Sequence, residues 1–136
     1  MTPAGLTLSH DFPGTFTNPA RRIHFEPSKN LVYADNGQII NPAIGTVPGR
    51  FITPSFFDST LMVADAAANR AYFLTVVQLH RGHFAIIHLT TLALVDSTTI
   101  NNINGNIGRL VRWGQNGLAF NTSGGQVFLV AGTFVH

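Results

Sequence analysis

The stretch Glu26-Pro-Ser-Lys-Asn30-Leu-Val-Tyr33 decides the fold, because it returns as Asp65-Ala-Ala-Ala-Asn69-Arg-Ala-Tyr72 and again as Arg112-Trp-Gly-Gln-Asn116-Gly-Leu-Ala119. Each copy places an asparagine in a turn and an apolar, strand-like segment directly after it. The asparagines are 39 and then 47 residues apart. A period of roughly 40–50 residues suits a four-stranded propeller blade, so the repeat predicts three such units.

Apolar segments on both sides of this stretch repeat as well. Those before it are Ile23-His-Phe25, Leu61-Met-Val63 and Arg109-Leu-Val111, and those after it begin at Gly37, His83 and Gly125. A fourth strand follows in the first two units, around 45–51 and 94–100, and the N-terminal segment 5–12 is expected to supply the fourth strand of the third unit. We therefore expect one domain of three blades, at roughly 22–51, 60–100 and 108–136, closed by the strand 5–12.

Composition agrees with an all-β protein. Of the 136 residues, 45% are hydrophobic and 10% are charged, whereas about 25% charge is usual in soluble domains. Helical periodicity is almost absent, and short clusters of β-branched and aromatic residues alternate with Asn, Gly, Pro and Asp. So little charge indicates a surface solvated by uncharged polar groups or covered by another subunit.

Two motifs in the first unit carry a resemblance. The segments Pro27-Ser-Lys-Asn-Leu-Val-Tyr33 and Ile40-Asn-Pro-Ala-Ile-Gly-Thr-Val47 resemble the bacterial β-propeller repeats of the YVTN and NHL-like kind. The middle unit departs from the pattern, with a longer insert at 75–82 and no Gly-Thr-Val. The resemblance implies four-stranded antiparallel blades and a bacterial secreted or cell-surface protein.

Three blades imply a partner. Closed rings typically contain four to eight blades, and three would leave two apolar faces bare. We expect a homodimer that closes a six-bladed ring with two-fold symmetry, or a piece of a longer propeller. The predicted function is a non-enzymatic scaffold or binding module that self-associates into the ring. The alternative is a carbohydrate-binding lectin with pockets between blades.

The candidate ligand-binding residues are Arg109, Arg112, Trp113, Tyr33 and Tyr72. Arginine and tryptophan can bind an acidic group or a sugar by forked hydrogen bonds and ring stacking, and the tyrosines would add stacking faces. In the structural interpretation, Trp113 packs between blades and the arginines lie at the rim. Glu26 and Asp65 occupy equivalent positions of the repeat, which predicts that both stabilise a turn.

The densest polar cluster is His80-Arg81-Gly82-His83, followed by His88. A metal site needs three or four convergent ligands. His83 and His88 are an odd number of residues apart and would point to opposite faces of a strand. We therefore interpret the cluster as a solvated hairpin turn and predict no metal and no cofactor.

Other function classes find little support in the sequence. It contains no cysteine and no Gly-x-Ser-x-Gly nucleophile turn, and its six carboxylates form no close pair along the chain. The basic residues are scattered, apart from Arg21-Arg22, so nucleic-acid binding is not expected. No apolar run reaches the roughly 18 residues of a membrane-spanning helix. An enzyme whose site combines residues from two chains in the ring's channel is the third hypothesis.

Overall fold

The computed structural model describes residues 11–16, 22–51, 60–77 and 80–135. In these residues the chain forms eleven β-strands, a short 3-10 helix and no α-helix. The strands are β1 (Ile23–Glu26), β2 (Leu31–Ala34), β3 (Gln38–Asn41), β4 (Thr46–Arg50), β5 (Thr60–Asp65), β6 (Arg70–Val77), β7 (Arg81–His88), β8 (Leu94–Ile100), β9 (Ile107–Trp113), β10 (Gly117–Thr122) and β11 (Val127–Ala131), followed by the helical turn η1 (Thr133–Val135).

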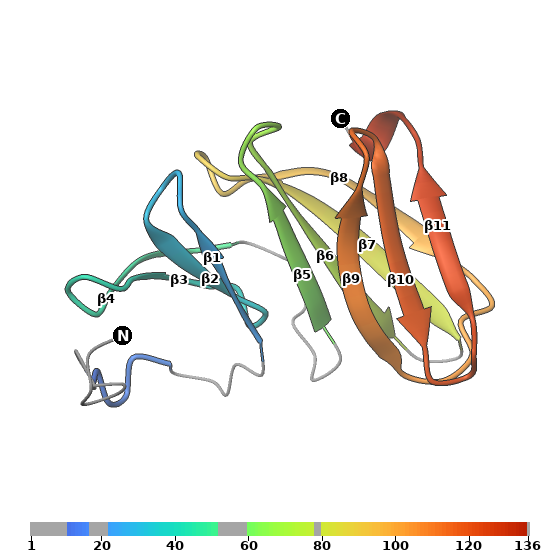
Figure 1. Cartoon of the computed structure of the whole chain (residues 1–136), viewed down its shortest axis with the longest axis horizontal. Coiled ribbons are helices and arrows are strands. Elements are labelled where there is room, and N and C mark those ends of the chain that lie inside the picture. Colours follow the sequence, from blue (N-terminus) through green and yellow to red (C-terminus); the bar gives the residue numbers. More distant parts are fainter. Residues whose placement is uncertain (1–10, 17–21, 52–59, 78–79, 136) are drawn as a thin grey trace, which may run out of the picture.

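The strands form three antiparallel sheets, each a simple meander in which every strand pairs with the next one along the chain (Figure 1). The first sheet is β1-β2-β3-β4, the second is β5-β6-β7-β8, and the third is β9-β10-β11. The all-β prediction is confirmed, and the sheets have four, four and three strands. Their sequential order is the one expected of short hairpin connections.

The turns between the first two strands of the first and second sheets have the same construction. Asn30 (φ 51°) and Asn69 (φ 54°) are both left-handed, a conformation that asparagine tolerates better than most residues. Glu26 Oε1 accepts hydrogen bonds from the backbone N–H and the hydroxyl of Ser28, and Asp65 Oδ1 accepts one from the backbone N–H of Ala68. The predicted turn-stabilising role of Glu26 and Asp65 is confirmed.

The third sheet makes the corresponding turn differently. Trp113 pairs directly with Gly117, which leaves three residues in the loop, whereas Glu26 pairs with Leu31 across a loop of four. The left-handed residue of this loop is Gly114 (φ 56°), and not Asn116. The alignment of Asn116 with Asn30 and Asn69 is therefore wrong by turn geometry, although the strands on both sides do recur.

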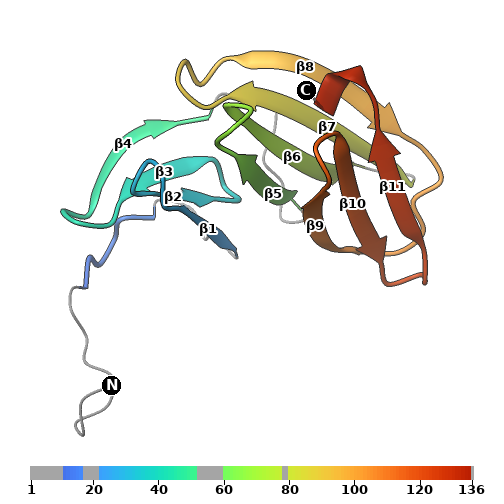
Figure 2. The same ribbon diagram turned by 45° about the horizontal axis from the view of Figure 1, so that its top comes forward.

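The second sheet is covered on both faces by the other two sheets, as Figure 2 shows. Side chains of β6 alternate between the two interfaces, because successive residues of a strand point to opposite faces. Tyr72 and Leu74 pack toward the third sheet, against Leu118 and Phe120. Ala71 and Phe73 pack toward the first sheet, where Phe73 meets Phe51 edge-on with ring centroids 5.2 Å apart. The fold therefore has two cores, one on each side of the second sheet.

The first strands of the three sheets are neighbours in space. β5 contacts β9 on one side and β1 on the other. Contacts between sheets at their outermost strands, β4, β8 and β11, are fewer among the described residues. The sheets are thus grouped around their first strands, and this common side of the molecule forms the groove described below.

Most of the segment expected to close the third sheet, residues 5–12, lies outside the described residues. The part that follows lies against the first sheet: Thr15 O accepts a hydrogen bond from Gln38 Nε2 at 3.1 Å. The Phe12 ring occupies the space beside Gly45, whose φ of +67° also favours glycine. Within the described residues, β11 pairs only with β10.

The two-core arrangement predicts a large stability loss on truncation of Phe73. We expect Phe73→Ala to lower the free energy of unfolding by about 3–5 kcal/mol, because it leaves a cavity in the core shared by the first two sheets. Phe16→Ala, at an exposed phenylalanine, is the matched control and should change stability by less than about 1 kcal/mol. Urea unfolding measures both. Equal losses in the two variants would contradict the assignment of Phe73 to a core.

Candidate functional site

A groove of about 300 Å³ runs between the first strands of the three sheets. β1 and the residue before it contribute Arg22, Ile23 and His24, β5 contributes Leu61, Met62 and Val63, and β9 contributes Arg109, Leu110, Val111 and Arg112. The groove therefore has an apolar centre and basic side chains on both sides. It contains the predicted candidates Arg109 and Arg112, together with Arg22 and His24, which the sequence did not single out.

Arg112 is a structural residue that joins the second sheet to the third. Its Nη2 lies 2.6 Å from Asp65 Oδ2, and both side chains are largely buried. The guanidinium also donates to the backbone carbonyls of Gln115 (2.6 Å) and Gly117 (3.3 Å), and its carbon lies 5.3 Å from the centre of the Tyr72 ring. The carboxylate and carbonyls already occupy the guanidinium, so Arg112 connects two sheets, whereas its predicted place at the rim of a ring stays a prediction.

Arg22 and Arg109 are exposed and differ from Arg112 in this respect. Among the described residues, neither guanidinium has a hydrogen-bond or ion-pair partner. The two also hold equivalent places: Arg22 lies two residues before His24, which pairs with Tyr33, and Arg109 lies two residues before Val111, which pairs with Ala119. The repeat register could have revealed this pair, although no local motif marks it.

Burial excludes the two tyrosines from contact with a ligand in this structure. Tyr33 is 1% exposed and Tyr72 is 0% exposed, and the Tyr72 hydroxyl donates to Val135 O at 2.6 Å. Desolvation by burial raises the pKa of both phenols above the ordinary value, with Glu26 adding to the rise at Tyr33. Both rings are core side chains, whereas the predicted stacking role requires an exposed ring face.

His24 lies between Tyr33 and the groove. Its ring is parallel to that of Tyr33, with centroids 6.5 Å apart, and its Nε2 is 3.8 Å from Glu26 Oε2. Neither this nitrogen nor the Tyr33 hydroxyl has a hydrogen-bond partner among the described residues. Both are buried polar atoms, and only His24 belongs to a residue that lines the groove.

Trp113 lies outside the groove, on the outer face of the third sheet. Its indole N–H donates to Leu118 O at 3.3 Å, and its ring occupies the space beside Gly117 where a larger residue's Cβ would stand. Nearly half of the side chain is exposed. Trp113 thus shares a surface with Val111 and Arg109, and the structure separates it from Arg112, which points to the opposite face of β9.

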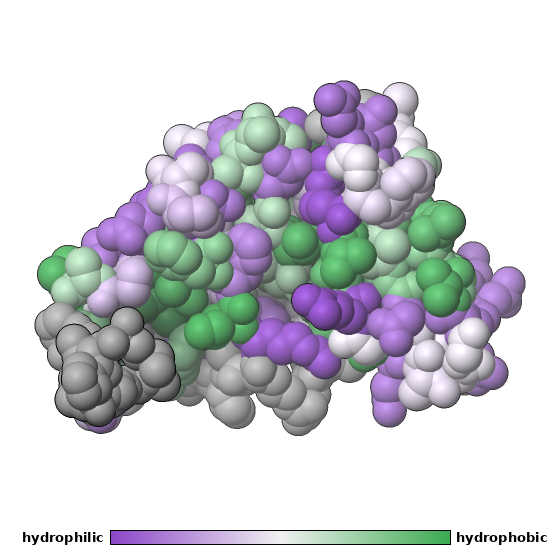
Figure 3. All heavy atoms as spheres, in the orientation of Figure 1, coloured by the Kyte–Doolittle hydropathy of each residue, from purple (hydrophilic) through white to green (hydrophobic). Residues whose placement is uncertain are grey.

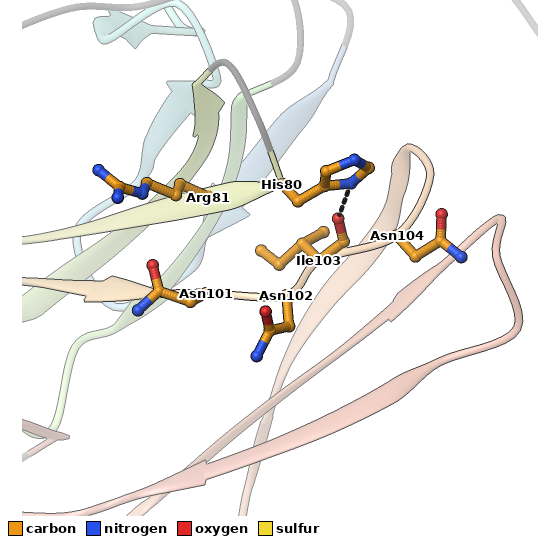
Figure 4. A pocket seen from close by; sticks show the side chains of 6 residues that line it. All are labelled: His80, Arg81, Asn101, Asn102, Ile103 and Asn104. Atoms are coloured by element: carbon orange, nitrogen blue, oxygen red, sulfur yellow. Dashed lines mark hydrogen bonds between the residues drawn. The ribbon is translucent and has the colours of Figure 1, made fainter.

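A second, more open hollow of about 770 Å³ lies between the second and third sheets (Figure 4). It is lined by His80, Arg81, Asn101, Asn102, Ile103 and Asn104. His80 Nδ1 lies 2.7 Å from Ile103 O, and the Ile103 N–H donates back to His80 O. His80 and Asn102 are both left-handed. No motif marks these asparagines in the sequence; their only signal there is that three of four consecutive residues, 101–104, carry a side-chain amide.

The three histidines near this hollow do not converge. His80 precedes β7, His83 lies within it and His88 ends it, where His88 contacts Asn69 and the backbone of Thr90 and Thr91. In the described part of the chain, no group of three or more metal-ligating side chains comes together. His80 and His88 lie at opposite ends of β7, so they cannot bind the same metal ion.

In comparisons with known proteins, no family model, no curated protein and no solved structure matches this chain. No helix within the described residues is long and apolar enough to cross a membrane. The geometry of the chain is therefore the basis of the functional argument.

The contacts of Arg112 predict a stabilising role. We expect Arg112→Ala to lower the free energy of unfolding by about 1.5–3 kcal/mol, because it leaves the largely buried Asp65 carboxylate without its charged donor. Arg109→Ala is the control and should have little effect, because within the described part of the chain this arginine has no ion-pair partner. Guanidinium-induced unfolding followed by near-ultraviolet circular dichroism measures both. A similar loss of unfolding free energy in the two variants would show that the ion pair with Asp65 does not stabilise the fold.

Proposed function

We propose that the protein is a non-enzymatic scaffold or binding module that self-associates, with two copies closing a six-bladed propeller ring. One observation carries the proposal: apolar positions that are buried in the second sheet have exposed counterparts on β1 of the first sheet and on one face of the third sheet. Each chain then carries two exposed apolar surfaces, one on the first sheet and one on the third, and each could contact the other surface of a second copy.

Equivalent residues on the third strands of the three sheets show how well the face toward the next sheet is covered. Tyr33 pairs with Ile39, Tyr72 with Ile86, and Ala119 with Leu129. Ile39 is 4% exposed and Ile86 is 1% exposed, because the next sheet covers each of them, whereas Leu129 is 69% exposed. The third sheet supplies the same kind of apolar face without a next sheet to cover it. We call this face, with Val111, Trp113, Val127 and Leu129, the leading face.

The opposite face of the first sheet is buried at Ala34 and Ile40, but β1 leaves apolar side chains exposed on it. Ile23 occupies the position held by Met62 in the second sheet and by Leu110 in the third, both of which pack against a neighbouring sheet. Ile23 is 66% exposed, and Phe25 on the same face is 50% exposed. We call this face the trailing face. Figure 3 shows apolar side chains gathered over β1 and over the third sheet.

A second copy is the occupant that fits both faces. Within one chain, the leading face of each sheet already packs on the trailing face of the next, so the leading face of the third sheet suits the trailing face of another chain's first sheet. Two chains joined this way in both directions give two identical contacts related by two-fold symmetry. Six units lie within the four to eight of closed propellers, and the low charge content supports covered surfaces.

Mutation of the leading face tests the ring. We expect the protein to sediment as a particle of two 14.7 kDa chains, and Val127→Asp/Leu129→Asp to sediment as a monomer. Each buried Val or Leu contributes about 1.5–3 kcal/mol, and a carboxylate in their place opposes burial. Leu94→Asp/Val95→Asp, at the same residue types exposed on β8, is the matched control and should remain a dimer. A monomeric parent, or equal behaviour of the two variants, overturns the proposal.

Carbohydrate binding is the second candidate, and the hollow in Figure 4 supports it. Amide side chains donate and accept hydrogen bonds at once, which suits neutral hydroxyl groups. The hollow lies between two sheets, as the predicted lectin pockets do, but it contains none of the residues predicted to bind the sugar. Its lining therefore replaces Trp113, Tyr33 and Tyr72 as the place for a sugar.

Glycan-array binding tests this candidate. We expect any binding to fall about tenfold or more in Asn101→Ala/Asn104→Ala, because two amide contacts are lost. Trp113→Ala should leave it unchanged, since that ring lies on the leading face. Loss of binding in Trp113→Ala alone would assign the sugar to the leading face instead.

A further inference from the structure

The groove between β1, β5 and β9 is basic without a compensating acid. Its ionisable lining residues are Arg22, His24, Arg109 and Arg112. Arg112 is neutralised by Asp65 at 2.6 Å, and Glu26 Oε2 lies 3.8 Å from His24 Nε2. The charges of Arg22 and Arg109 remain, and no carboxylate lines the groove.

The apolar side chains between the two arginines increase the attraction that these charges exert on an anion. Leu61 occupies the place in the second sheet that Arg22 holds in the first and Arg109 in the third, and it is buried, as is Leu110 beside it. The positions of Arg22 and Arg109 therefore lie on either side of β5, whose apolar side chains line the groove between them. Electrostatic attraction is stronger beside such low-dielectric material than in open water. A guanidinium presents paired N–H donors that match the oxygens of carboxylate and phosphate.

We propose that this groove binds a small anionic molecule bearing carboxylate or phosphate groups, with Arg22 and Arg109 as the charged contacts. His24 faces the same space, and its Nε2 has no hydrogen-bond partner among the described residues. The groove belongs to the single chain, but its enclosure rests on the proposed ring: closure would bring four such arginines, two from each copy, around one axis.

Calorimetric titration with pyrophosphate and with citrate tests this site and separates the two kinds of acid group. We expect at least one of them to bind, and binding to weaken as salt rises, because the contacts are ionic. Arg22→Gln and Arg109→Gln should each weaken binding about tenfold, the loss of one charge-assisted contact. Arg81→Gln, at an exposed arginine in the other hollow, is the matched control. Glucose is the neutral control ligand.

The same titrations on Leu129→Asn separate this site from ring formation, because this substitution alters the leading face without placing a carboxylate beside Arg109. Binding that survives in this variant and falls in the arginine variants supports the groove, whatever the sedimentation result. Binding present only in the dimer, and lost in the arginine variants, supports it as well. Absence of binding by both anions, or equal weakening in Arg81→Gln, overturns the site while leaving the ring proposal intact.

Discussion

The structure depends on one constraint, which is that a sheet with apolar side chains on both faces must be covered on both. The inner strands of the second sheet, β6 and β7, meet this constraint. Alternate residues of β6, such as Tyr72 and Phe73, enter different cores and are almost fully buried. In the first sheet, β1 leaves apolar side chains exposed, and the third sheet leaves one face exposed. The internal packing and the proposed self-association both follow from this difference between the second sheet and the two sheets that flank it.

Arg112 shows how a polar contact specifies the same packing. Apolar faces alone permit two sheets to slide, because contacts between them are not directional. The pair of Arg112 with Asp65 joins the first strand of one sheet to the first strand of the next. Asp65 also stabilises the turn that follows β5, so one carboxylate links local turn geometry to the position of the neighbouring sheet.

The sequence predicts the elements well, because each strand is bounded by its own turn residues. The repeat around Asn30 and Asn69 identifies two turns correctly, down to the left-handed asparagine. It fails at Asn116, where Trp113-Gly114 makes a shorter loop, since Gly114 permits a left-handed residue earlier in the turn. Local chemistry can change a loop length while the strands keep their pattern.

The candidate site is less predictable, because its residues meet only when sheets pack. The burial of Tyr33 and the ion pair of Arg112 depend on a sheet other than their own, and no local pattern records them. Arg22 and Arg109 share a register position but have different neighbours in the sequence. The asparagines at 101–104 gain a role only where the chain crosses from the second sheet to the third.

Bare faces at both ends of a chain impose a requirement on angle. A head-to-tail contact generates a closed object only if the turn from one unit to the next divides a full circle evenly. Were the tilt between neighbouring sheets slightly smaller or the rise along the axis larger, the same two surfaces would add copies without limit and form a filament. In the proposed ring, the packing of Phe73 and Leu118 between sheets would therefore bear on the form of the assembly as well as on stability.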